Sequence, residues 1–260
     1  MTRATTRVLL AAALTALPAC AQLPRGERGV FGTRPPAADP LVARHIALVA
    51  DGAGDYRACS RELRRAARDD GWPLDVNTFV WSHGYMRNLA DHTDHANIRA
   101  RAHELAAQVT DLQRARPDMP VSLVGHSTGS AVVLAAAEEL PAGSLDRIVL
   151  LAPAVSYDYD LRPALKSVRG GINVFYSRED RFWLGVVPVV LGTADDRMES
   201  RAAGRVGFKP EVQPGEEILY SKLTQYEWNP TVEQVGNDGG HFGAYAQGHL
   251  KMFVLPLFQY

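Results

Sequence analysis

Short apolar runs alternate with longer amphipathic stretches along most of the chain. From about Leu41 onward, aliphatic and β-branched residues gather in short runs, and each run is followed by a segment in which apolar residues recur three or four positions apart. Such runs are typical of buried parallel strands, and the longer pattern is typical of the helices that cover them. The pattern predicts one α/β domain over residues 41–260, with a mostly parallel central sheet and helices on both faces.

The positions of the runs predict the order of the elements. Strands are expected at residues 46–50, 75–81, 121–125, 147–151, 172–176 and 218–223. Helices are expected at residues 56–69, 96–114, 128–140 and 242–255. The segment between the strands at 147–151 and 172–176 is short, so no large cap domain is expected.

The first forty residues follow a different pattern. Arg3 and Arg7 precede an apolar run at 8–17, which predicts a signal peptide over residues 1–19. The ending Leu17-Pro18-Ala19-Cys20 resembles a bacterial lipoprotein box, which implies that Cys20 receives lipid, palmitate included, and anchors the protein in the bacterial cell envelope, at the periplasmic or outer face. Ala19-Cys20-Ala21 also fits ordinary signal cleavage, so a secreted form stays open. Residues 20–40, rich in Pro, Gly and Arg, predict a flexible linker.

Composition narrows the class of partner. The 28 Lys and Arg residues nearly balance the 29 Asp and Glu residues, which leaves a net charge of −1 and no basic field for nucleic acid. The two cysteines are too few for a disulfide framework and lack zinc-ligand spacing. Cys59 is expected to be a small buried residue.

The sequence Gly125-His126-Ser127-Thr128-Gly129 fits the pattern G-x-S-x-G. The apolar run 121–124 leads into it, and the apolar helix expected at 128–140 follows it. In such a strand-to-helix elbow the turn is so tight that the outer positions must be glycine, and the serine hydroxyl is lifted clear of the sheet. Ser127 is therefore the candidate nucleophile.

With this elbow and this order of elements, residues 41–260 resemble the α/β-hydrolase superfamily. The resemblance implies an α/β-hydrolase fold and a chain order of Ser, acid and His, because a serine hydroxyl needs a histidine base that a carboxylate orients. It places the acid after the strand at 172–176, where Asp180 is the first choice and Glu179 its nearest rival. Other carboxylates lie one strand too early or late in a loop, namely Asp158, Asp160, Asp195 and Asp196.

The resemblance places the base between the last strand and the final helix. His241 lies there, within Gly239-Gly240-His241-Phe242-Gly243, and the glycines allow the loop to bring its ring to the serine. His126 and His249 are set aside, because the elbow directs the first elsewhere and the second falls inside the expected helix.

An oxyanion hole needs two backbone N–H groups. The resemblance assigns one to Thr128 and the other to the loop after the first strand, where Asp51-Gly52-Ala53-Gly54 replaces the usual His-Gly and makes Ala53 the candidate donor. Asp51 puts a carboxylate near this site, unless its side chain caps the following helix. His83-Gly84 stays open as the alternative donor loop.

Two further features were weighed. The polar cluster His83, Asp91, His92, Asp94, His95 and His103 lacks a recognised metal spacing, so no metal is expected, and the 91–95 loop is expected to border the serine pocket. The apolar run 182–191 either lines an acyl pocket or dips into lipid, or is a partly buried connection.

The sequence thus predicts a serine hydrolase of carboxylesterase or lipase type that acts through an acyl-enzyme on Ser127. Expected substrates are small-molecule or lipid-like esters, with thioesters and amides open, and no cofactor is required. The membrane is an expected partner if Cys20 carries lipid, and nucleic acid is not. The alternative is a lipid-anchored binding protein that keeps the fold without turnover, for which Asp51 is the motivating residue.

Overall fold

The computed structural model describes residues 43–181, 192–197 and 200–259, and all of them belong to the compact unit formed by residues 38–260. The expectations for the signal peptide, for Cys20 and for the linker lie outside the described residues, as does the apolar run 182–191. Within the described part of the chain, no helix is long and apolar enough to cross a membrane.

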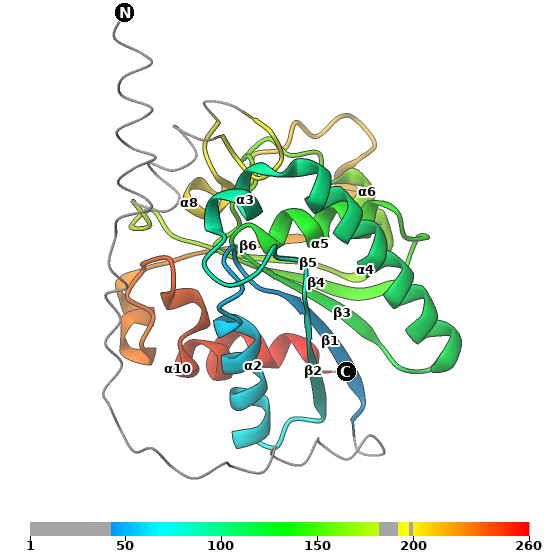
Figure 1. Ribbon diagram of the computed structural model, residues 1–260, viewed down its shortest axis with the longest axis horizontal. Coiled ribbons are helices and arrows are strands. Elements are labelled where there is room, and N and C mark those ends of the chain that lie inside the picture. The colour runs from blue at the N-terminus through cyan, green and yellow to red at the C-terminus, as the bar shows by residue number, and fades with distance from the viewer. Residues whose placement is uncertain (1–42, 182–191, 198–199, 260) are drawn as a thin grey trace, which may run out of the picture. The chain divides into compact units, whose positions relative to one another are not determined.

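A six-stranded parallel sheet in the order β2-β1-β3-β4-β5-β6 forms the centre of the fold (Figure 1). The chain starts with β1, moves outward to β2, and then returns past β1 to build the remaining strands in sequence order. The carboxyl ends of parallel strands meet at one edge, so the loops after β1 and β3 lie side by side there. The strands are β1 (His45–Ala50), β2 (Leu74–Phe79), β3 (Val121–His126), β4 (Leu145–Leu151), β5 (Val168–Tyr176) and β6 (Leu223–Glu227).

Helices cover both faces of the sheet (Figure 1). One face carries α4 (His95–Ala115), α5 (Gly129–Glu138) and α6 (Arg162–Ser167), with α3 (Asn88–Thr93) close to α4. The other carries α2 (Ala58–Asp69) and the helical segments near the C-terminus. Further short helices are α8 (Ala203–Val206), α9 (Glu217–Tyr220) and α10 (Gln247–His249).

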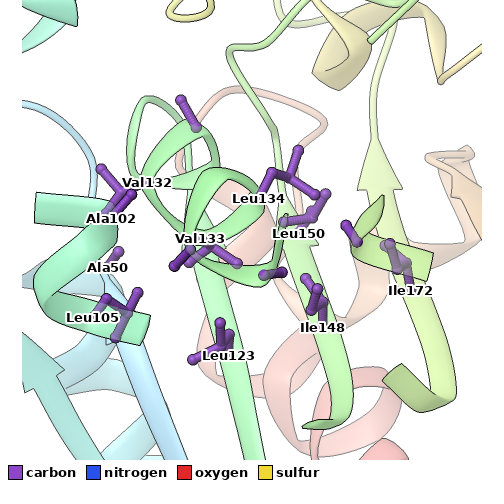
Figure 2. Close-up of a cluster of buried hydrophobic side chains, with 14 of the residues drawn as sticks. Ala50, Ala102, Leu105, Leu123, Val132, Val133, Leu134, Ile148, Leu150 and Ile172 are labelled. Carbon is purple, nitrogen blue, oxygen red and sulfur yellow. The ribbon is translucent and has the colours of Figure 1, made fainter. Parts of the chain in front are cut away.

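Successive side chains along each strand point to opposite faces of the sheet, so the core is divided into two layers. In β1, Leu48 faces the α4–α5 layer while Val49 faces the α2 layer. Figure 2 shows the first layer, in which Leu123, Ile148 and Leu150 of the sheet pack beneath α5. Full burial of such a side chain contributes about 1.5–3 kcal/mol. The β3–α5 connection therefore lies on a densely packed base.

Two expected elements were wrong. The run expected as a strand at 218–223 is the short helix α9, in which Ile218 is 83% exposed, and the strand begins only at Leu223. The expected helix at 242–255 is broken, because Ala246 is extended with ψ at 141° and Gly248 packs so closely that a β-carbon there would lie 2.5 Å from the Val235 carbonyl oxygen. In its place are two 3₁₀ turns, at Gly243–Tyr245 and Leu255–Phe258, α10, and a π-helix at Leu250–Val254.

Candidate active site

The elbow between β3 and α5 holds Ser127 in a left-handed backbone conformation, with φ at 51°. Its N–H donates to the Leu151 carbonyl oxygen over 3.1 Å, which ties the turn to β4. A β-carbon on Gly125 would lie 2.7 Å from Ser130 Cα, and one on Gly129 would lie 2.2 Å from the Ala50 carbonyl oxygen. Only glycine fits at either position, so the motif follows from close backbone packing.

His241 and Asp180 reach Ser127 through two hydrogen bonds. His241 Nε2 lies 2.9 Å from Ser127 Oγ, and His241 Nδ1 lies 2.6 Å from Asp180 Oδ2. Both the histidine and the carboxyl are buried. Because an ionised carboxylate only accepts hydrogen bonds, the Nδ1 proton belongs between His241 and Asp180, and Nε2 is then able to accept the serine proton.

The other carboxylates considered as the acid lie elsewhere. Glu179, the nearest rival, is exposed and pairs with Arg181 at 2.9 Å. The remaining ones are bound locally, Asp158 to Arg197, Asp160 to Arg162, Asp195 to Ser156 and Asp196 to His95. The geometry therefore brings Asp180 to His241 and engages each of these rivals with another group.

His126 supports the loop that carries His241. Its Nε2 lies 3.2 Å from the His241 carbonyl oxygen, and its ring packs edge-on against Tyr245. Burial, with the neighbouring His241 ring as a second cause, lowers the pKa of His126 to about 3. The ring is therefore neutral at ordinary pH, and Nε2 must carry the proton that it donates to the carbonyl. His126 thus contacts the backbone of His241 and does not share the serine proton.

Of the two candidate loops for the second oxyanion donor, one lies against Ser127. A β-carbon on Gly52 would lie 3.2 Å from Ser127 Cβ, so the 51–54 loop passes directly beside the serine. A β-carbon on Gly84 would meet no described atom within 4 Å, and His83 is turned to Asp91 at 2.9 Å. Thr128 directly precedes α5, where the first N–H groups lack partners within the helix. The N–H groups of Ala53 and Thr128 are thus the neighbours from which an oxyanion hole can be built.

Asp51 is directed to α2. Its Oδ1 accepts a hydrogen bond from the Ser60 N–H at 3.1 Å, in the first turn of that helix. Burial raises the pKa of the Asp51 carboxyl, and the hydrogen bonds from Ser60 oppose that rise. The alternative in which Asp51 caps the helix is confirmed.

Asp91 is a supporting residue that sequence reasoning missed. Its fully buried carboxylate accepts from the Gly54 N–H at 2.7 Å, from the His83 N–H at 2.7 Å and from Ser82 Oγ at 2.5 Å. Asp91 thereby joins the loop after β1 to the loop after β2. The sequence showed only a carboxylate in a polar stretch, because its partners lie up to 37 positions away.

His92 connects the elbow to the segment at 192–197. Its Nε2 lies 2.9 Å from the Gly192 carbonyl oxygen, and its Nδ1 lies 3.1 Å from Thr128 Oγ1. Burial lowers the pKa of His92, so the ring is neutral, Nε2 donates and the Thr128 hydroxyl donates to Nδ1. The 91–95 segment was expected as a loop but is mostly helical, since it ends α3 and begins α4, and its His92 still contacts Thr128 next to Ser127. The described residues contain no cluster of three or more His, Cys, Asp or Glu that could hold a metal ion.

A cavity of about 160 Å³ lies on the far side of Asp180. Its described lining includes the aromatic residues Phe175, Tyr226, Trp228 and Phe253, and Ser127 and His241 are absent from it. The cavity therefore adjoins Asp180 and not Ser127.

Comparison with known proteins agrees with the geometry. Residues 83–179 match the family model described as serine aminopeptidase, S33, and the matched stretch contains the elbow and ends one residue before Asp180. Over that stretch the chain resembles the α/β-hydrolases, and its parallel sheet and strand-to-helix elbow give it an α/β-hydrolase fold. As the sequence predicts, the fold has a parallel sheet with helices on both faces.

Individual relatives are distant. Human monoglyceride lipase is 28% identical over 111 residues, which are 42% of this chain, and the chain spans about a third (35%) of that relative's length. An α/β serine hydrolase without a lid from Xanthomonas campestris covers 84% of this hydrolase at 18% identity, and 81% of its own chain is covered, with a TM-score of 0.49. A Trichoderma reesei cutinase solved with a phosphonate inhibitor covers 59% at 20% identity, with 71% of its chain covered and a TM-score of 0.41.

Proposed function

We propose that this α/β-hydrolase is a serine hydrolase that cleaves a carboxylic ester through an acyl-enzyme on Ser127. The observation that supports the proposal is the pair of hydrogen bonds from Ser127 Oγ to His241 Nε2 at 2.9 Å and from His241 Nδ1 to Asp180 Oδ2 at 2.6 Å. A base within hydrogen-bond reach of a nucleophile, itself oriented by a third group, is the arrangement that activates a serine.

The proposed reaction has two halves. In the first, His241 Nε2 takes the Ser127 proton while Oγ attacks the ester carbonyl carbon, and the N–H groups of Thr128 and Ala53 hold the resulting oxyanion. The tetrahedral adduct then expels the alcohol, which receives the proton from His241, and leaves an acyl group on Ser127. In the second half His241 takes a proton from water, the hydroxide attacks the acyl carbon, and the carboxylic acid and the free serine are released.

Replacement of the nucleophile tests the proposal. Ser127→Ala removes Oγ and should abolish both labelling by a fluorophosphonate probe and hydrolysis of p-nitrophenyl acetate. Ser221→Ala is a matched control, since the Ser221 hydroxyl is exposed and bonds only to the Ile218 carbonyl among the described residues. An enzyme that is still active and still labelled after Ser127→Ala would refute the assignment.

The substrate bond is an ester by default. Thioesters and amides pass through the same tetrahedral adduct, so matched p-nitrophenyl, thiophenyl and p-nitroanilide substrates with one acyl group would rank them by kcat/KM. A small ester or a lipid-like ester is the substrate we propose. The alternative, a binding protein without turnover, was motivated by Asp51, and the contact of that carboxylate with Ser60 withdraws the motivation.

We also propose that the protein is lipid-anchored in the cell envelope through Cys20. The lipoprotein-like sequence around Cys20 supports this location. Growth with radioactive palmitate should label the wild-type chain and not Cys20→Ala, and label on both or on neither would contradict the proposal.

A further inference from the structure

Exposed apolar side chains gather beside the nucleophile. Tyr56 is 45% exposed, Tyr85 68%, Met86 58% and Leu89 45%. We call these four residues the Tyr85 patch. Exposed apolar residues are ordinary when they are scattered, whereas a contiguous group marks a contact surface.

Direct contacts join the two segments that carry the Tyr85 patch. The rings of Tyr56 and Tyr85 meet edge to face, with their centroids 5.5 Å apart. Asn88 Nδ2 donates to the Tyr56 hydroxyl at 3.2 Å, and Leu89 is the next residue of α3. Two segments that are some thirty positions apart in sequence therefore build one surface.

The Tyr85 patch is also continuous with the active-site loop. The Met86 N–H donates to the Gly54 carbonyl oxygen at 3.0 Å, and Gly52 of the same loop lies against Ser127. The loop proposed to carry the oxyanion donor Ala53 thus has the nucleophile on one side and the patch on the other. Any surface that binds to the Tyr85 patch would therefore lie beside Ser127.

The backbone beneath the patch is strained. Asp55, Arg57 and Met86 all have positive φ, at 51°, 51° and 62°. Each such residue costs about 1–2 kcal/mol relative to the right-handed conformation. Strain of this kind persists only where surrounding contacts hold it, and it is concentrated at functional sites. Here the left-handed backbone at Met86 accompanies a side chain that is exposed to solvent.

The composition of the patch and its rim fits a lipid surface. Tyrosine rings favour the boundary between water and hydrocarbon, and Leu and Met supply a shallow apolar contact. Arg87 is exposed beside the patch and complements anionic headgroups. Arg57 and Arg61 are also exposed but pair with Asp55 and Glu62. Four side chains are far fewer than the roughly 20 residues per partner of a stable protein interface. A lipid surface is therefore favoured over a protein partner.

We propose that the Tyr85 patch seats the enzyme on an anionic lipid surface and so places Ser127 next to esters in that surface. The choice of lipid esters as substrates rests on the proposed function, whereas adsorption through the patch does not. Arg87 then lies at the level of the headgroups while Tyr85 and Met86 enter the interface.

Flotation with vesicles tests the adsorption. Full-length protein carrying Ser127→Ala and Cys20→Ala, which prevent turnover and any lipid on that cysteine, is mixed with vesicles of phosphatidylglycerol and phosphatidylcholine. Adding Tyr85→Ser and Met86→Ser should lower the partition coefficient at least fivefold. Ile218→Ser is the matched control, because Ile218 is 83% exposed on α9, which precedes β6 and so lies at the opposite edge of the sheet. That control should change partitioning less than twofold.

The outcomes separate the possible occupants of the patch. Equal partitioning of the patch variant and the parent, or equal loss in the Ile218→Ser control, would overturn the proposal. So would a parent that forms dimers in sedimentation without vesicles while the patch variant stays monomeric, since a second copy would then cover the surface. Hydrolysis of p-nitrophenyl acetate by protein with Ser127 intact reports on the proposed function separately, because that ester is soluble and flotation requires no turnover.

Discussion

The nucleophile elbow and the loop of the base are held in place by different forces. The elbow is fixed by close backbone approach, since Gly125 and Gly129 leave no room for a β-carbon. The loop around His241 is fixed by side-chain hydrogen bonds, from His126 Nε2 to the His241 carbonyl and from Trp228 Nε1 to the Asn237 carbonyl at 2.7 Å. Steric packing is all or none, whereas a hydrogen-bonded loop is able to move without unfolding the sheet. Changes in the elbow should therefore reduce stability and activity together, and changes around the base should reduce activity first.

We expect the largest effect on activity from a change next to the proposed base, His241. Asp180→Asn keeps the shape of the side chain but replaces an acceptor with an amide that stabilises the wrong tautomer of His241. We expect kcat for ester hydrolysis to fall by about 10⁴. Glu179→Gln, one residue away and exposed, should stay within twofold of the wild type. Similar losses in the two variants would show that the orientation of His241 does not depend on Asp180.

Gly129→Ala breaks the elbow. The new β-carbon would lie 2.2 Å from the Ala50 carbonyl oxygen and 2.4 Å from that of Asp51, so β1 and its loop must shift. We expect the free energy of unfolding to fall by about 3 kcal/mol, with at least a hundredfold loss of kcat/KM. Urea unfolding and ester hydrolysis measure both. Gly71→Ala, in open space at a φ of 67°, should cost only about 1 kcal/mol. If Gly129→Ala lost activity but kept the free energy of unfolding of the wild type, the elbow would not be held by steric packing.

His126→Phe sharpens the comparison, because it removes one hydrogen bond from the base loop and keeps an aromatic ring beside Tyr245. We expect kcat to fall about tenfold, which corresponds to about 1.4 kcal/mol, with KM unchanged. His45→Phe is the control, since His45 is also buried and bonds to Ser122 at 2.7 Å, at the start of β1 and so at the far edge of the sheet. It should lower stability without changing kcat. A fall in kcat for both would mean that burial of any histidine matters and that the contact with His241 does not.

The last expected effect concerns pH. Burial lowers the pKa of His126 from 6.5 to about 3, and those of His45 and His249 to about 4. The folded protein therefore binds fewer protons than the unfolded chain below pH 6.5, so the stability from these neutral rings is present above pH 6.5 and is lost as the pH falls toward 4. Each ring adds a slope of about 1.4 kcal/mol per pH unit. His126→Phe should reduce the slope of the unfolding free energy between pH 6 and 4 by that amount, measured with urea. An unchanged slope would show that His126 titrates normally in the fold.

Much of the fold could be predicted because its central strands are buried on both faces. β1 and β3 therefore appear in the sequence as continuous apolar runs. β6 is an edge strand with exposed positions, and the more apolar run just before it, which contains Ile218, was mistaken for the strand. Periodicity reports burial, so it fails where a strand is half exposed.

Only those residues of the candidate site that follow from the order of elements along the chain could be predicted from the sequence. Ser127, Asp180 and His241 follow from the elbow and from the order of strands, and the structure brings their side chains within hydrogen-bond distance, while their catalytic roles stay predictions. The contacts of Asp91 and His126 are set by distances across the sheet edge, and no local pattern encodes them. Sequence reasoning therefore selected three side chains that the structure brings together, and it missed the contacts that hold the loops around them.

The contact of His92 with both Thr128 and Gly192 has a consequence for how this protein can diversify. A new specificity would ordinarily be obtained by remodelling a peripheral segment while the reacting groups stay untouched. Here Gly192 shares one imidazole with Thr128, which directly precedes α5, so remodelling residues 192–197 also disturbs the elbow. Variants with altered selectivity at that segment should carry a loss of turnover unless His92 is compensated, which makes that histidine the natural starting position for a combinatorial library.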